Sequence, residues 1–146
     1  MAKVKGRIYI NQPVDVVFDE VVDIRNEPTY NPNMIHAELR TEEPIQKGAE
    51  FSAQAKSRND TLDMRITSTE FKKSEYIGSR TISDHMEVNG GLTFSSSGAD
   101  TLLDWNWDVR LKGNLLLFTP FISLLGNRQE KRIWQGLKDK LEHEAE

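Results

Sequence analysis

The segment Leu103–Lys112, LDWNWDVRLK, alternates apolar and polar residues almost without a break. A period of two is typical of a strand with one face in a core and the other in water. The inward residues would be Leu103, Trp105, Trp107, Val109 and Leu111. The outward residues would be Asp104, Asn106, Asp108, Arg110 and Lys112. The segment therefore predicts a half-buried antiparallel sheet, and it is the best-determined strand of the chain.

Turn residues on the N-terminal side of this strand suggest how it pairs. The tetrapeptide SGAD (Ser97–Asp100) predicts a hairpin turn that would pair Phe94 with Leu103. The tripeptide NGG (Asn89–Gly91) is a second turn signal and predicts another hairpin. Both registers bring large apolar side chains to one common face, as a half-buried sheet requires.

Along the chain as a whole, the spacing of apolar residues changes from strand-like to helical and back again. Lys3–Ile10 has the alternation of a first strand, and Asn11–Asp23 has apolar residues at helical spacing. The following NEP predicts a short second helix, capped by Asn26 and ended before Pro32. From Met34 to Lys112 the period is two again, which indicates about six more strands.

The C-terminal segment predicts one long helix, with Pro120 in its first turn. Its apolar stripe consists of Phe118, Ile122, Leu125, Ile133, Leu137 and Leu141. The charged residues after Gly126 are assigned to the exposed face: Arg128, Glu130, Lys131, Arg132, Lys138, Asp139 and Lys140. This helix is the only predicted element long enough to cover an open sheet.

The predicted architecture is a single α+β domain over residues 1–146. A curved antiparallel sheet of about seven strands wraps around the long C-terminal helix, with two short helices between strands 1 and 2. A curved sheet that grips a helix leaves space between the two, so we expect an internal pocket.

Composition excludes several classes of protein. The formal charge of −4, from 19 basic and 23 acidic residues, argues against a nucleic-acid groove. The absence of cysteine excludes disulfides, thiolate catalysis and cysteine-ligated zinc. No signal peptide is evident, and the most apolar run, Leu115–Gly126, is too short to span a bilayer. We expect a cytoplasmic protein without integral membrane association, either a monomer or a weak dimer.

Four pieces of the sequence resemble a known superfamily. They are Ile8–Met34, the pair Gly48 and Phe51, Gly90–Gly113 with its GGLTF and TLLDWNWDVRLKG, and GLKDKLE (Gly136–Glu142). In order and spacing the chain resembles the START-like helix-grip (SRPBCC) superfamily, and more narrowly its bacterial polyketide cyclase/dehydratase-like branch. The resemblance implies an apolar small molecule, such as a lipid, polyketide or aromatic metabolite, held between sheet and helix.

Three functions are compatible with this resemblance. The leading interpretation is a non-catalytic binder, because no convergent catalytic set is evident in the sequence. The second is a polyketide cyclase or dehydratase, which would require polar side chains that converge inside the cavity. The third is a protein-interaction accessory module, which would be favoured by a filled cavity and a large exposed apolar patch.

The predicted ligand-binding residues are mostly apolar. Large side chains on the inner face of the sheet or on the covering helix are candidates for the pocket wall, and they serve equally well as plain core. These candidates are Phe51, Met64, Phe94, Trp105, Trp107, Phe121 and Leu125.

Two polar candidates have two possible orientations each. Arg80 points into the grip in one register, where it would bind an anionic or carbonyl group, and lies on the surface in the other. Tyr30 either donates its hydroxyl to the pocket or plugs the end of the core with its ring.

Neither a catalytic set nor a metal or cofactor site is predicted. The consecutive residues of SDH (Ser83–His85) cannot converge on one substrate carbonyl, so a strand end or bulge is the better interpretation. The acidic pairs Glu42–Glu43 and Asp104/Asp108 fall on predicted loop and outer-face positions, where a carboxyl group stays solvated. No histidine spacing matches a metal motif.

Overall fold

The computed structural model describes residues 2–57 and 60–144, apart from the side chains of Ser57 and Phe118. It contains seven strands in one sheet of order β1-β7-β6-β5-β4-β3-β2, and every neighbouring pair is antiparallel. The elements in chain order are β1 (Ala2–Ile10), α1 (Val14–Val22), η1 (Ile24–Thr29), β2 (Met34–Leu39), β3 (Glu50–Ser57), β4 (Asp60–Lys72), β5 (Tyr76–Ile82), β6 (Met86–Ser97), β7 (Asp100–Leu111), η2 (Gly113–Phe118) and α2 (Thr119–Glu144). This is the predicted helix-grip architecture.

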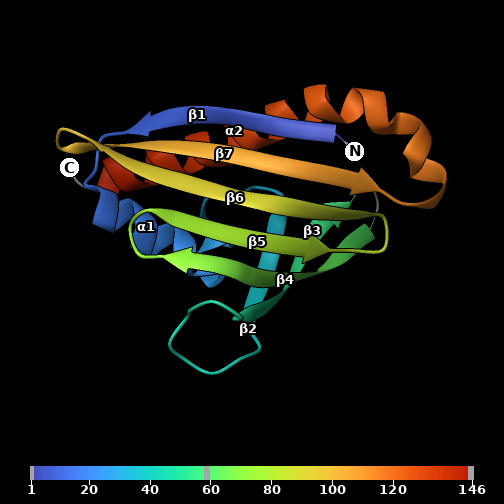
Figure 1. Ribbon diagram of the computed structural model, residues 1–146, viewed down its shortest axis with the longest axis horizontal. Helices are drawn as coiled ribbons and strands as arrows, with labels where there is room; N and C mark the ends of the chain where they lie inside the picture. The colour runs from blue at the N-terminus through green and yellow to red at the C-terminus, as the bar shows by residue number, and fades with distance from the viewer. Residues whose placement is uncertain (1, 58–59, 145–146) are drawn as a thin grey trace.

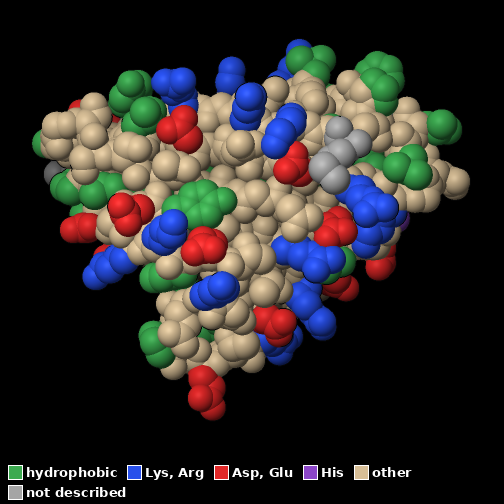
Figure 2. Space-filling view, viewed as in Figure 1, with side chains coloured by type: hydrophobic (Ala, Val, Ile, Leu, Met, Phe, Trp, Pro, Cys, Tyr) green, Lys and Arg blue, Asp and Glu red, His purple; other side chains and the backbone are tan. Residues whose placement is uncertain are grey.

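The central pair of strands, β6 and β7, has the predicted register. The turn between Ser97 and Asp100 pairs Phe94 with Leu103, and β7 buries its alternate apolar residues as expected. Its outer face carries ion pairs such as that between Lys3 Nζ and Asp108 Oδ1 at 2.8 Å. Figure 2 shows basic and acidic side chains interspersed over this outer face of the sheet.

The predicted turn at NGG is wrong. Asn89–Gly91 lies inside β6, which runs unbroken from Met86 to Ser97, and the turn before it is at Ser83–His85. A methyl group on Gly90 would overlap the backbone carbonyl of Asn106 in β7, and Gly90 has a φ of 145°. These glycines therefore allow a close approach of backbones within the sheet rather than a reversal of the chain.

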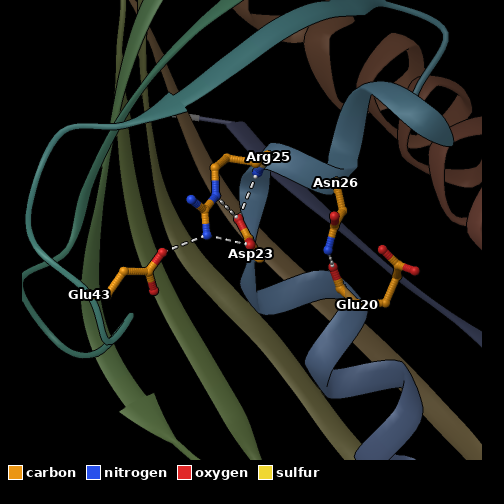
Figure 3. Close-up of polar contacts among 5 residues, drawn as sticks. All are labelled: Glu20, Asp23, Arg25, Asn26 and Glu43. Carbon is orange, nitrogen blue, oxygen red and sulfur yellow. Dashed lines mark hydrogen bonds and ion pairs between the residues drawn. The ribbon is translucent and has the colours of Figure 1, made fainter.

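The connection from α1 to η1 is held by polar contacts that Figure 3 displays. Asp23 caps η1, because its carboxylate accepts from the Arg25 backbone N–H at 3.1 Å and from the Arg25 guanidinium at 2.8 Å. The same guanidinium reaches Glu43 at 2.8 Å. The predicted cap Asn26 instead donates to the Glu20 carbonyl at 3.1 Å. Asp23 precedes the helix by one residue and so reaches its free N–H groups first.

The long helix α2 packs against β1 and β7, on the side of the sheet away from the viewer in Figure 1. Of its predicted stripe, Ile133, Leu137 and Leu141 are buried, and Trp134 is buried with them. Phe118, which was assigned to the same stripe, has a side chain outside the described residues. The helix joins α1, β6 and β7 in the larger core.

A second, smaller core lies under the other half of the sheet. It consists of Met34, Ala37, Ala49, Phe51, Ala53 and Ile66 from β2, β3, β4 and the loop before β3. The two cores are separate clusters of buried residues. The cavity that borders both cores is the candidate site.

Candidate functional site

A cavity of about 540 Å³ borders both cores. This volume falls within the range of small-molecule sites. The inner face of the sheet supplies one wall, while η1 and the N-terminal half of α2 supply the other. Most of the lining is apolar: Val4, Val21, Val22, Ile24, Met34, Phe51, Ala55, Leu62, Met64, Ile66, Ile77, Met86, Val88, Leu92, Trp107, Val109, Ile122, Leu125, Ile133 and Trp134.

Four of the predicted ligand-binding residues line this cavity, namely Phe51, Met64, Trp107 and Leu125. Phe51 and Met64 come from neighbouring strands, β3 and β4, and Trp107 comes from β7. Leu125 lies on α2 and has 56% of its surface exposed, so it stands where the cavity meets solvent.

The other apolar candidates do not line the cavity. Phe94 is buried against Phe18, with ring centroids 5.1 Å apart, and belongs to the core between α1 and the sheet. Trp105 is also buried, beside Trp134. Phe121 lies on α2 with 61% of its surface exposed.

Arg80 lies on the outer face of the sheet. Its neighbours Ser79 and Thr81 line the cavity, so the alternation along β5 directs the Arg80 side chain the other way. Its Nε donates to the Glu87 carboxylate at 2.6 Å. The pKa of Glu87 is lowered by its hydrogen bonds with Asn89 and Arg80.

Tyr30 plugs the end of the core. It is 5% exposed, its ring centroid lies 6.1 Å from that of Trp134, and it is not among the cavity-lining residues. Its hydroxyl has no hydrogen-bond partner among the described residues. Burial raises the pKa of Tyr30 well above its ordinary value, and the charge of Glu27 raises it further.

One carboxyl group in the cavity is Glu130, which the sequence assigned to the exposed face of the long helix. That assignment is wrong, because Glu130 lines the cavity and is half-buried. Burial raises the pKa of Glu130 to about 8, and the charge of Glu27 adds to this increase. The indole N–H groups of Trp107 and Trp134 oppose the increase, although neither reaches the carboxylate with full hydrogen-bond geometry.

A second carboxyl group, Glu27, enters the cavity from η1. Burial raises the pKa of Glu27, and a hydrogen bond from Asn31 opposes that increase. The Asn31 side-chain amide donates to Glu27 at 2.7 Å, and its oxygen accepts from the Asn33 backbone at 3.0 Å. Asn31 is itself only 6% exposed, so it holds Glu27 in place from within the fold.

The helix spacing carries a signal for the inward position of Glu130. Glu130 precedes Ile133 by three residues and Leu137 by seven, so it lies on the same helical face as both. A charged residue at such a position faces the space between the sheet and the long helix. Glu27 offered no comparable signal, because η1 is a single short helix without a repeating apolar face.

The spacing between η1 and α2 is set by a direct contact of backbones. A methyl group on Gly136 would overlap the backbone carbonyl oxygen of Tyr30. The absence of a side chain at this position lets α2 approach η1 closely. This contact holds η1, which carries Glu27, close to α2, which carries Glu130, and the charge of Glu27 acts on Glu130. We call the part of the cavity that these two residues line the carboxyl end.

An exposed apolar segment adjoins the cavity. It comprises Leu116, Leu117, Phe121, Leu124 and Leu125, and Leu117 is the most exposed of them at 82%. Figure 1 places η2 and the start of α2 at one end of the molecule, and Figure 2 shows hydrophobic side chains gathered there. None of the helices in the described residues is long and apolar enough to cross a membrane.

Comparison with known proteins adds information on the fold. No family model matches the sequence, and no curated protein matches it. Several solved structures match over nearly the full length of both chains. The START superfamily protein from Mycobacterium smegmatis has a TM-score of 0.85 at 14% identity, covering 98% of this chain and 99% of that one. The protein has the START-like helix-grip fold.

Two further structures show the same fold. TTHA0849 from Thermus thermophilus has a TM-score of 0.83 at 14% identity and covers 99% of both chains. The Zhui aromatase/cyclase from Streptomyces sp. R1128 has a TM-score of 0.79 at 12% identity, covering 99% of this chain and 95% of that one. At such low identity the likeness concerns the fold, and function has to be argued from the site.

Proposed function

We propose that the protein binds an apolar small molecule in the cavity between the sheet and α2. The observation that carries this proposal is the cavity itself, which has a volume of about 540 Å³ and mostly apolar walls. The apolar atoms that line a cavity of this size depend on an occupant for the close packing contacts found elsewhere in a protein interior. A bound apolar molecule would restore those contacts and remove its own surface from water.

The experiment compares two serine-to-leucine variants on neighbouring strands. Ser79 lines the cavity from β5, whereas Ser95 is exposed on β6. We expect Ser79→Leu to reduce binding of an apolar ligand about tenfold or more by filling the space, and Ser95→Leu to leave it unchanged. Tryptophan fluorescence reports the binding, since Trp107 and Trp134 line the cavity.

Candidate ligands would come from native mass spectrometry of the protein isolated from its own cells, and from a panel of lipids and aromatic compounds. Failure of every apolar compound to bind would refute the proposal. Equal binding by both leucine variants would also refute it, because the ligand would then lie outside the cavity.

A second candidate function is catalysis of the cyclase or dehydratase type. The specific observation in its favour is that two carboxyl groups, Glu27 and Glu130, line the same cavity and that the charge of Glu27 acts on Glu130. With a pKa of about 8, Glu130 would hold its proton at neutral pH and could donate it to a substrate oxygen. Turnover of a polyketide-type substrate that is lost in Glu130→Gln, with binding retained, would establish this function.

The interaction-module alternative has weaker support. It called for a filled cavity beside an exposed apolar patch, and here the apolar segment is present but the cavity is open.

A further inference from the structure

The carboxyl end of the cavity contains two acidic groups without a basic partner. Among the described residues, neither Glu27 nor Glu130 forms an ion pair with lysine, arginine or histidine. The described lining includes a single basic residue, Lys56, whose side chain is exposed at the edge of β3. Carboxyl groups that are partly withdrawn from water are normally paired, so two half-buried ones that share one cavity without a basic partner call for an explanation.

The groups that face Glu130 come from three elements, and none is positively charged. They are Glu27 from η1, the Trp107 indole from β7, and the Trp134 indole from α2 itself. The Tyr30 hydroxyl, which feels the charge of Glu130, is neutral. An anionic head group would be repelled here, whereas a cation would complete the site.

Two aromatic rings complete the carboxyl end of the cavity. Trp107 and Trp134 both line the cavity next to Glu130. Their N–H groups lie toward the Glu130 carboxylate, so the two rings border the carboxyl end without adding a positive charge to it. The rest of the cavity is apolar, so the cation would need to be attached to an apolar body.

We propose that the ligand is an apolar molecule bearing a basic amine, and that its ammonium group binds between Glu27 and Glu130 beside Trp107 and Trp134. This inference rests on the proposed function, because it assigns a ligand class to the same cavity. It also predicts that binding of the amine releases a proton from the protein. At neutral pH the arriving ammonium displaces up to one proton from Glu130, and that proton passes to the buffer.

The test compares three ligands with one decyl chain: decylamine, decanol and decanoate. Isothermal titration calorimetry at pH 7 should show decylamine binding about tenfold more tightly than decanol, and decanoate binding more weakly than either. Titrations in buffers of different ionisation enthalpy should show proton release with decylamine and none with decanol.

Two glutamine variants assign the effect to its residues. Glu130→Gln should bring decylamine within about twofold of decanol, while decanol still binds and so shows that the cavity is intact. Glu42→Gln is the matched control, because Glu42 is exposed and its replacement removes the same charge from the surface. It should leave the tenfold preference unchanged.

Each outcome bears on one of the two proposals. If none of the three ligands binds, the proposed function fails and the amine inference fails with it. If decanol binds as tightly as decylamine, or decanoate more tightly, the amine inference is overturned while the proposed function stands. A preference for decylamine that survives both Glu130→Gln and Glu27→Gln would place the cation elsewhere and would also overturn the inference.

Discussion

Replacing Glu130 with glutamine should change how the stability of the protein depends on pH. Glu130 has an ordinary pKa of 4.5 in the unfolded chain and a pKa of about 8 in the folded protein. Between these values the folded state holds a proton that the unfolded state has released. The free energy of unfolding therefore falls as pH rises through this window, and the contribution is fully present only below about pH 4.5.

The size of this effect follows from the width of the window. Each pH unit inside it changes the free energy of unfolding by about 1.4 kcal/mol, so the whole window corresponds to a few kcal/mol, on the order of 3 to 5. That is a large fraction of the stability of an ordinary domain. Glutamine has a similar shape and no charge, so Glu130→Gln should remove this contribution to the slope.

The assay is urea unfolding at pH 5, 6, 7 and 8, monitored by circular dichroism. The difference in stability between Glu130→Gln and the wild type should grow with pH, reaching a few kcal/mol in favour of the variant at pH 8. The control variant Glu42→Gln should follow the wild type at every pH. A constant difference between Glu130→Gln and the wild type from pH 5 to pH 8 would refute the assignment of Glu130 as a half-buried, proton-holding group.

Three further predictions concern stability at a single pH, measured by denaturant unfolding. Gly136→Ala should lower the free energy of unfolding by about 1–3 kcal/mol, because the added methyl group meets the carbonyl of Tyr30. An unchanged free energy of unfolding would show that α2 and η1 separate freely. Leu137→Ala should lower the free energy of unfolding by about 2–5 kcal/mol, because Leu137 is fully buried. Leu124→Ala, on the exposed side of the same helix, should change it by less than about 0.5 kcal/mol. Similar losses in the two variants would contradict the packing described. Gly90→Ala should be strongly destabilising, since Gly90 has a φ of 145° and closely faces the backbone of β7; tolerance of alanine there would contradict the continuous strand β6.

The fold could be predicted from the sequence because its strongest signals are periodic. The alternation in Leu103–Lys112 and the turn at Ser97–Asp100 depend only on neighbours in the chain, and both predictions hold in β6 and β7. The turn at Asn89–Gly91 failed for a physical reason. Glycine permits both a reversal and a close approach of strands, and only the position of β7 distinguishes the two.

The candidate site was harder to predict, because it depends on contacts between distant segments. Trp107 and Phe51 were recognised as wall candidates because large inward residues of a gripping sheet face the cavity. Glu130 was assigned to the surface from its charge, although its spacing from Ile133 places it on the inner face. Glu27 lacked any local pattern, and its position in the cavity follows from how η1 docks beside α2.

The exposed apolar segment at the start of α2 has a practical consequence for ligand discovery. Leu117, Phe121 and Leu124 offer a hydrophobic dye a docking place outside the cavity, so fluorescent dyes should bind with a stoichiometry above one per chain. Polar substitutions at these three positions should remove dye binding on the surface and leave dye binding in the cavity unchanged. A triply substituted protein of this kind would be the better reagent for screening, since its dye signal would come from the interior alone.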